Sequence, residues 1–242
     1  MPNWCSNSLV ISGKKSTILD LMQRAASGEH RYVGPFNNRN NDTDWGAFTP
    51  IQMEALMKDD DLFLDKSGKS SCFSFHAFVP VPREVMLSPY DIGELNRKRA
   101  EYPEWFGRFP NLIAGYDWET NHWGCKWGAS DPMIGSQFGD DEDYSVEYCF
   151  DTPWGPPTDF MHSFALMYPN LSFTLNFREE GMGFQGEYIW SNGACIRMED
   201  GAIEQEEEED EWEENSYELC PACQASVLPE EIRDGKCPNC PE

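Results

Sequence analysis

The sequence predicts an α+β fold in which an antiparallel sheet carries two helices on one face. Several short segments alternate apolar and polar residues with the period of two that is typical of strands. Two other segments place apolar residues at helical spacing. Hydrophobic residues make up 40% of the 242 residues, which is ample for a packed core. These observations favour a globular domain over a disordered chain.

The first predicted strand covers residues 4–12, which end in the apolar run Leu9-Val10-Ile11. A helix is predicted over residues 16–26, where four apolar residues fall at i, i+3, i+4 and i+7. Those residues are Ile18, Leu21, Met22 and Ala25. Residues 29–70 are rich in Asn, Asp and Gly and are predicted to form a surface insert with a short helix near residues 50–58.

A second strand is predicted over residues 72–79 and is ended by Pro80 and Pro82. Its alternating positions are Phe73, Phe75, Ala77 and Val79. Residues 83–143 then form a second insert, with a helix over residues 92–102 followed by an aromatic-rich loop.

A third strand is predicted over residues 144–150, a second helix over residues 161–168 and a fourth strand over residues 171–177. Two more strands flank a hairpin turn at Ser191-Asn192-Gly193 and cover residues 184–190 and 194–198. The order of strand, helix, strand, strand, helix and strand is the split βαβ, or ferredoxin-like, plan. It predicts a domain over residues 1–198, with inserts at about 29–70 and 83–143, and fixes no function.

The charge of the chain is −25 and lies unevenly. Residues 199–214 contain 11 acidic side chains, and such a run repels itself. It predicts an acidic tether over residues 199–216. This charge disfavours nucleic acid and suits a protein partner or imitation of nucleic acid. No apolar run is long enough to span a membrane, and no signal peptide is visible, so we expect a cytoplasmic protein.

Residues 217–242 are predicted to form a zinc ribbon. Four cysteines follow the pattern C-x2-C-x13-C-x2-C, namely Cys220, Cys223, Cys237 and Cys240. Four thiolates suit one tetrahedral, structural zinc ion and leave no open position for catalysis. The alternative is a redox-active Cys-x-x-Cys pair. The presence of two such pairs in tandem favours zinc over this alternative. The other five cysteines are expected to be small buried hydrophobes.

The segment 116–128 is the candidate binding site of the main domain. Its candidate residues are Trp118, Asn121, His122, Trp123, Lys126 and Trp127. Aromatic rings in a loop can stack on a base or a planar ligand, and a lysine can meet an anion. The alternative is that the tryptophans pack structurally against the sheet.

Several motifs together resemble the YubB-type ferredoxin-like proteins of bacteriophages and conjugative plasmids. They cover residues 2–198 and are Asn3-Trp-Cys-Ser-Asn7, Phe78-Val-Pro-Val-Pro82, Asn121-His-Trp-Gly-Cys-Lys-Trp127, Thr152-Pro-Trp-Gly-Pro-Pro157 and Glu180-Gly-Met-Gly-Phe184. The resemblance implies a mobile element acting in the cytoplasm of a bacterial host. It brings no catalytic residues with it.

Three functions remain open on the sequence. The first is a non-enzymatic accessory protein that binds a host protein, with the zinc ribbon as a docking module. The second is nucleic-acid or nucleotide binding through residues 116–128, with Arg97-Lys-Arg99 nearby. The third is an enzyme, for which Cys125 beside His122, or a cation at Asp140–Asp143, would be the starting point.

Overall fold

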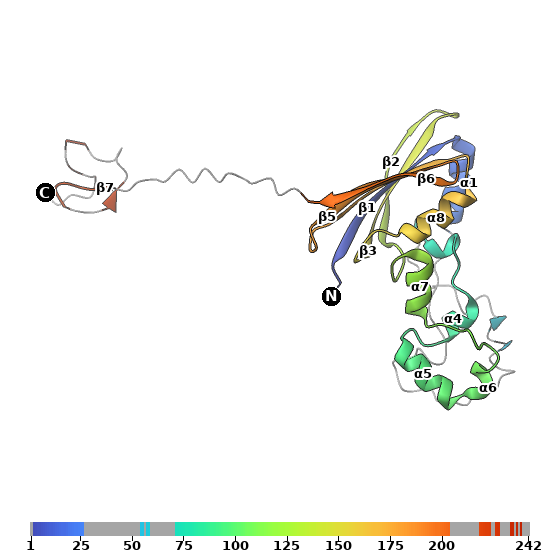
Figure 1. The fold of residues 1–242 in the computed structure, drawn as a ribbon. Helices are drawn as coiled ribbons and strands as arrows, with labels where there is room; N and C mark the ends of the chain where they lie inside the picture. The colour runs from blue at the N-terminus through green and yellow to red at the C-terminus, as the bar shows by residue number, and fades with distance from the viewer. Residues whose placement is uncertain are drawn as a thin grey trace. The chain divides into compact units, whose positions relative to one another are not determined.

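Figure 1 shows the fold in a computed structural model, which describes residues 2–26, 54–55, 57–58, 71–203, 218–223, 226–227, 233–234, 236 and 238. The chain divides into two units, Met1–Ile203 and Glu204–Glu242. Within the described ranges, no helix is long and apolar enough to cross a bilayer.

The first unit is built on a six-stranded antiparallel sheet with the order β2-β3-β1-β4-β5-β6. The strands are β1 (Trp4–Gly13), β2 (Ser130–Gly139), β3 (Tyr144–Pro153), β4 (Ser172–Glu179), β5 (Phe184–Ser191) and β6 (Ala194–Ala202). The first four strands stand in the ferredoxin-like order, with β1 and β3 at the centre. The hairpin β5–β6 extends the sheet beyond β4. The predicted fold class is therefore confirmed.

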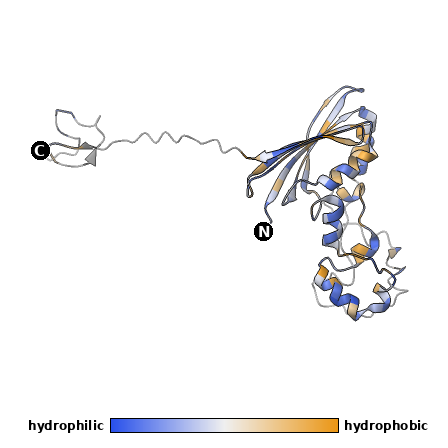
Figure 2. Ribbon diagram, in the orientation of Figure 1, coloured by the Kyte–Doolittle hydropathy of each residue, from blue (hydrophilic) through white to orange (hydrophobic). Residues whose placement is uncertain are grey.

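Two helices, α1 (Lys15–Ala25) and α8 (Thr158–Met167), cover one face of this sheet (Figure 1). Along β1 the residues Leu9 and Ile11 are buried, whereas Ser8 and Val10, which alternate with them, are only half-buried. This alternation directs one row of β1 side chains into the core and the other onto the open face. Both helices contribute apolar residues to the same core. Figure 2 colours the hydrophobic residues of the ribbon orange.

The second strand lies elsewhere than the sequence predicts. Residues 72–79 form a loop around a short 3-10 helix, Phe75–Ala77, and not a strand. Phe73, Phe75 and Phe78 of this loop are all buried. These aromatic residues therefore fill the core although the loop pairs with no described strand. The second strand of the ferredoxin-like plan is instead β2, which is exposed along almost its whole length. A strand that buries neither face gives no apolar alternation to detect.

This correction moves the long insert to the position before the second strand. Over residues 83–129, which the structure describes throughout, the insert carries the helices α4 (Arg83–Leu87), α5 (Ile92–Glu101), α6 (Pro103–Phe106) and α7 (Gly115–Trp123). The predicted helix over residues 92–102 is confirmed as α5, whose first turn is capped by Asp91. Most of the predicted insert over residues 29–70, including most of its short helix, lies outside the described residues.

The hairpin at residues 191–193 forms as predicted. Asn192 and Gly193 have φ of 53° and 75°, the left-handed conformation that a type I′ turn requires. The following strand continues to Ala202, so residues 199–202 of the predicted tether belong to the sheet. Residues 204–216 lie outside the described part of the chain.

Candidate functional site

The segment 116–128 is a helix and a turn, where the sequence suggested a loop. Helix α7 ends at Trp123 because Gly124 takes a left-handed φ of 77°, and its N–H donates to the carbonyl of Thr120. A helical segment separates its side chains onto different sides of the backbone. The six candidate residues therefore do not face one surface together.

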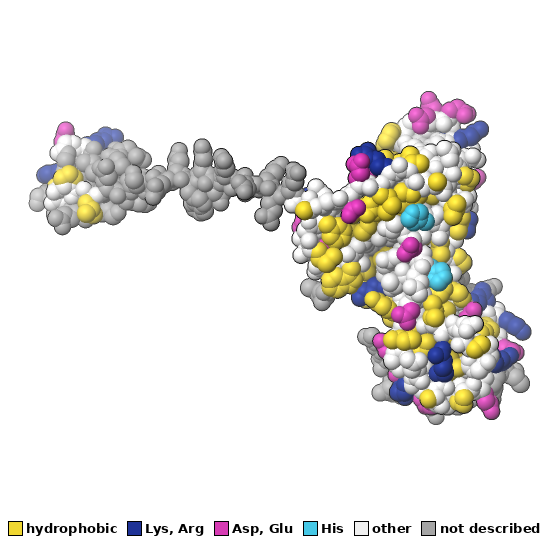
Figure 3. Space-filling model, in the orientation of Figure 1, with side chains coloured by type: hydrophobic (Ala, Val, Ile, Leu, Met, Phe, Trp, Pro, Cys, Tyr) yellow, Lys and Arg dark blue, Asp and Glu magenta, His cyan; other side chains and the backbone are white. Residues whose placement is uncertain are grey.

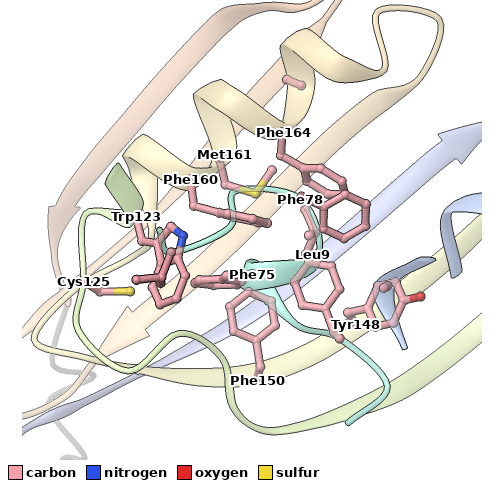
Figure 4. Packing of buried hydrophobic residues seen from close by; sticks show 14 of the residues in the cluster. Leu9, Phe75, Phe78, Trp123, Cys125, Tyr148, Phe150, Phe160, Met161 and Phe164 are labelled. Carbon is pink, nitrogen blue, oxygen red and sulfur yellow. The ribbon is translucent and has the colours of Figure 1, made fainter. Parts of the chain in front are cut away.

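Two of the three tryptophans belong to the core. Trp118 is 7% exposed and Trp123 is fully buried. The Trp123 ring meets Phe75 edge-on with 5.8 Å between centroids, and its indole N–H donates to the carbonyl of Val79 at 3.0 Å. Figure 4 shows this ring beside Phe75 in the core. Trp118 and Trp123 are therefore core residues and not the ligand contacts that the sequence suggested.

Trp127 is exposed and forms a surface cluster. Trp127 is 46% exposed and Trp4 is 41% exposed, and the centroids of their rings lie 6.3 Å apart. The Lys126 ammonium lies 3.9 Å above the Trp127 ring, a cation–π contact. We call Trp4, Lys126 and Trp127 the tryptophan patch. Sequence reasoning missed Trp4 because 123 residues separate it from Trp127, although it stands in one of the motifs singled out above.

The remaining two candidates, Asn121 and His122, lie on the exposed side of α7. The His122 ring stacks on Trp118 with 4.2 Å between centroids, and its Nδ1 lies 2.7 Å from the Trp118 carbonyl oxygen. These contacts account for His122 as a residue that covers the outer side of a core tryptophan.

A buried carboxylate holds the turn of the tryptophan patch. Glu119 is 1% exposed, and its Oε2 accepts the backbone N–H of Trp127 at 2.8 Å and the hydroxyl of Tyr90 at 2.7 Å. Trp127 has a φ of 68°, a conformation that costs a residue with a side chain about 1 kcal/mol or more. The hydrogen bond to Glu119 offsets this cost. Burial, followed by the nearby charge of Glu119, raises the pKa of Tyr90, so its hydroxyl stays a donor.

Replacing Glu119 with Ala is therefore expected to release the turn. The change leaves the Trp127 N–H and the Tyr90 hydroxyl without this acceptor, at a cost of about 1–3 kcal/mol for each buried group that is left unpaired. Hydrogen exchange of the Trp127 amide should become much faster. Tyr90→Phe is the matched control, because it removes one donor and keeps the bond to Trp127. Unchanged exchange at Trp127 in Glu119→Ala would show that the carboxylate does not hold the turn.

The geometry at Cys125 does not suit nucleophilic catalysis. Cys125 is 4% exposed, and burial, followed by the charge of Glu119, raises the pKa of its thiol. A nucleophilic cysteine needs the opposite shift and access to substrate. The acidic run at Asp140–Asp143 is the turn between β2 and β3, where Asp140 Oδ1 accepts the N–H groups of Glu142 and Asp143, both at 3.0 Å. Both starting points for an enzyme thus have a structural explanation.

The open face of the sheet is polar. On β1 and β3 it carries hydrogen-bonded pairs, with Ser6 donating to Asp151 at 2.9 Å and Ser8 donating to Glu147 at 2.7 Å. A cavity of about 770 Å³ lies on this face and is lined by residues of β1, β3, β4, β5 and β6. The arginine on its lining, Arg178, lies 3.4 Å from Glu180 and 3.0 Å from Gln185. Apart from Trp4 at the start of β1, no aromatic side chain stands on the open face of β1 or β3.

In the second unit the structure describes two of the four predicted zinc ligands. Cys220 is buried and directly follows β7 (Glu218–Leu219), and Cys223 lies in the turn that leads to β8 (Ser226–Val227). Cys237 and Cys240 lie outside the described residues. Just before Cys237, Arg233 and Lys236 exchange two backbone hydrogen bonds at 2.9 and 3.0 Å. Among the residues that are described, no three potential metal ligands converge.

Comparison with known proteins finds a matching family model and a similar solved structure. Residues 135–219 match the family model described as the ferredoxin-like domain in Api92-like protein. A similar solved structure is the crystal structure of a protein Api92 from Yersinia pseudotuberculosis, with 11% identity and a TM-score of 0.49. The alignment covers 84% of this chain and 98% of that one. No curated protein sequence matches the chain.

Proposed function

We propose that the chain is a non-enzymatic binding protein that engages a protein partner through the tryptophan patch. The observation that carries this proposal is the exposure of Trp4 and Trp127 beside Lys126, on a turn that a buried carboxylate holds in place. Large exposed aromatic rings are typical of the residues that contribute most to protein interfaces. A rigid turn also lowers the entropy lost on binding.

A protein partner suits this surface better than a nucleic acid does. Ferredoxin-like domains that bind single-stranded RNA stack bases on aromatic residues of the open sheet face. Here the same face carries Trp4 at the first residue of β1, but beyond it come serines on β1 and the carboxylates Glu147 and Asp151 on β3. Arg178 also has a carboxylate beside it. The charge of −25 adds a long-range repulsion for phosphates.

The second part of the proposal is a zinc ribbon that serves as a docking module. The hairpin β7–β8 supports it, because it brings Cys220 and Cys223 to one end of two short strands. The hairpin at Arg233 and Lys236 ends directly before the second cysteine pair, whereas the first pair lies between β7 and β8. Two such hairpins fit the four-thiolate donor set of a structural zinc ion. The motifs shared with the YubB-type proteins support a bacterial host protein, in the cytoplasm, as the partner of a phage or plasmid accessory protein.

The proposal is tested by affinity purification of the full chain from the bacterial host, with and without nuclease. Wild-type protein should retain one reproducible partner, and Trp4→Ala with Trp127→Ala should weaken its binding by about 30-fold or more, as for a central interface tryptophan. Trp127→Ala adds no backbone strain, since both residues carry a Cβ. Phe138→Ala is the control, because Phe138 is an exposed aromatic residue on β2 and is 58% exposed.

Two results would count against the proposal. Loss of the captured material after nuclease treatment would point to nucleic acid as the ligand. Equal binding by the double variant and by wild type would remove the tryptophan patch from the interface.

A further inference from the structure

The two edges of the sheet differ in their protection against pairing with another strand. At the β2 edge, register shifts interrupt the pairing with β3 between Ser130 and Met133 and again between Ile134 and Gln137. Pro132 also lacks the N–H that an added strand would need. Bulges and proline are the usual devices that protect an edge strand. The β2 edge therefore cannot easily accept a further strand.

The β6 edge lacks these devices over most of its length. From Arg197 to Ala202 the strand pairs with β5 in regular register, and its only irregularity lies before Arg197. No described strand pairs with its outer side. Ile196 is 64% exposed and Met198 is 49% exposed, and Figure 3 shows a band of hydrophobic side chains on this side of the unit. A regular edge with exposed apolar residues is a template for one more strand.

We propose that this edge pairs with the β6 edge of a second copy of the chain. The two strands run antiparallel around a two-fold axis at Met198. A two-fold contact joins the same surface of both copies, so it needs a strand that is complementary to itself. The inference is independent of the tryptophan patch and of its proposed partner.

The charges on β6 select this register. Arg197 and Glu199 stand two residues apart on the open face, where Arg197 contacts Glu199 and lies 3.3 Å from Glu187. With the axis at Met198, Arg197 lies opposite Glu199 of the second copy, and the reverse pair forms on the other side of the axis. Moving the axis by one residue places either Arg197 opposite Arg197 or Glu199 opposite Glu199. Like charges directly opposite each other destabilise a strand pair.

The apolar side of the strand agrees with the same register. Met198 faces Met198 of the second copy, so a half-exposed apolar residue becomes covered in both chains. The antiparallel arrangement also sends the chain away from β6 in opposite directions in the two copies. The acidic runs that follow the two β6 strands then begin at opposite ends of the dimer interface. Salt at about 0.15 M screens charges over about 8 Å, which weakens the repulsion between the two runs.

The first test measures the mass of the full chain in solution by analytical ultracentrifugation. Wild type should have twice the chain mass of 27.8 kDa. Arg197→Glu should raise the dissociation constant by about tenfold or more, because it creates two like-charge contacts across the axis. Arg197→Glu with Glu199→Arg restores both pairs and should restore the dimer. Met133→Glu, on the β2 edge, is the control that keeps the dimer, and melting temperatures verify that each variant is folded.

A second test locates the axis. Cα atoms of directly opposite residues in an antiparallel pair lie about 4.5–5.5 Å apart, which a disulfide can bridge. Met198→Cys should therefore crosslink two chains under mild oxidation, whereas Ile196→Cys should not exceed the background that wild type gives. A monomeric wild type, or a dimer that Arg197→Glu leaves intact and Met198→Cys does not crosslink, would overturn the proposal.

Discussion

Removal of zinc is expected to unfold the C-terminal module and to leave the sheet domain folded. Residues 217–242 contain few large apolar side chains, so the proposed zinc ion would supply much of their folding free energy. For structural zinc in small peptides this contribution is about 10–16 kcal/mol at neutral pH. Purified protein should contain one zinc ion per chain by elemental analysis. A strong chelator should abolish the NMR dispersion of the module alone.

The matched variants separate zinc binding from general effects of cysteine loss. Cys220→Ser with Cys237→Ser should lose the ion without a change in the melting of residues 1–203. Cys195→Ser is the control, because this partly buried cysteine lies on β6, outside the C-terminal module, and its thiol donates to the carbonyl of Arg197. Full zinc retention in the double variant would refute the assignment of the ligands.

Trp123→Ala is expected to cost the sheet domain about 3–5 kcal/mol of unfolding free energy, as for a fully buried large aromatic residue. The variant also leaves the carbonyl of Val79 without its indole donor. The cost is large because the ring joins two parts of the core. It meets Phe75 edge-on, and Phe75 stacks on Phe160 of α8 with 4.0 Å between centroids (Figure 4). Urea denaturation followed by circular dichroism measures the change.

Trp127→Ala is the companion variant for this experiment. It removes the same kind of side chain four residues later, from a position that is 46% exposed. Its effect on the unfolding free energy should stay within about 0.5–1 kcal/mol, because surface substitutions remove few buried contacts. Similar destabilisation by both variants would contradict the division of the segment into core and surface.

The sequence predicted the elements that bury one face. Strands β1, β3 and β4 and helices α1 and α8 all carry the periodicity of two or 3.6 that one-sided burial imposes. The prediction of a strand over residues 72–79 was wrong because the alternating aromatic residues of this segment fill the core from a loop. Strand β2 escaped prediction because both of its faces are exposed. The predicted fold class is correct despite these errors. Residues 72–79 and β2 both precede β3 in the chain, so the order of strands and helices is unchanged.

The candidate site was less predictable because it depends on tertiary contacts. The sequence identified the segment 116–128 but could not tell which tryptophans face the core. That division follows from Gly124, which ends α7 and sends Trp127 to the surface. The pairing of Trp127 with Trp4 and the support from Glu119 join positions that no local pattern relates. The role of Glu119 had no sequence signal, because a buried carboxylate is rare and a helix accepts Glu anywhere.

The central position of β1 has a consequence for the order of folding. β1 is the earliest of the six strands in the chain, yet its neighbours are β3 and β4, which end at Pro153 and Glu179. During synthesis the apolar run at Leu9–Ile11 therefore has no strand partner until β3, which ends 142 residues after Ile11, has left the ribosome, and its second partner β4 follows later still. Contacts of such sequence separation form slowly. Pulsed hydrogen exchange during refolding should find the hairpin β5–β6 protected before β1, and a nascent chain that stops before β4 should depend on chaperones to stay soluble.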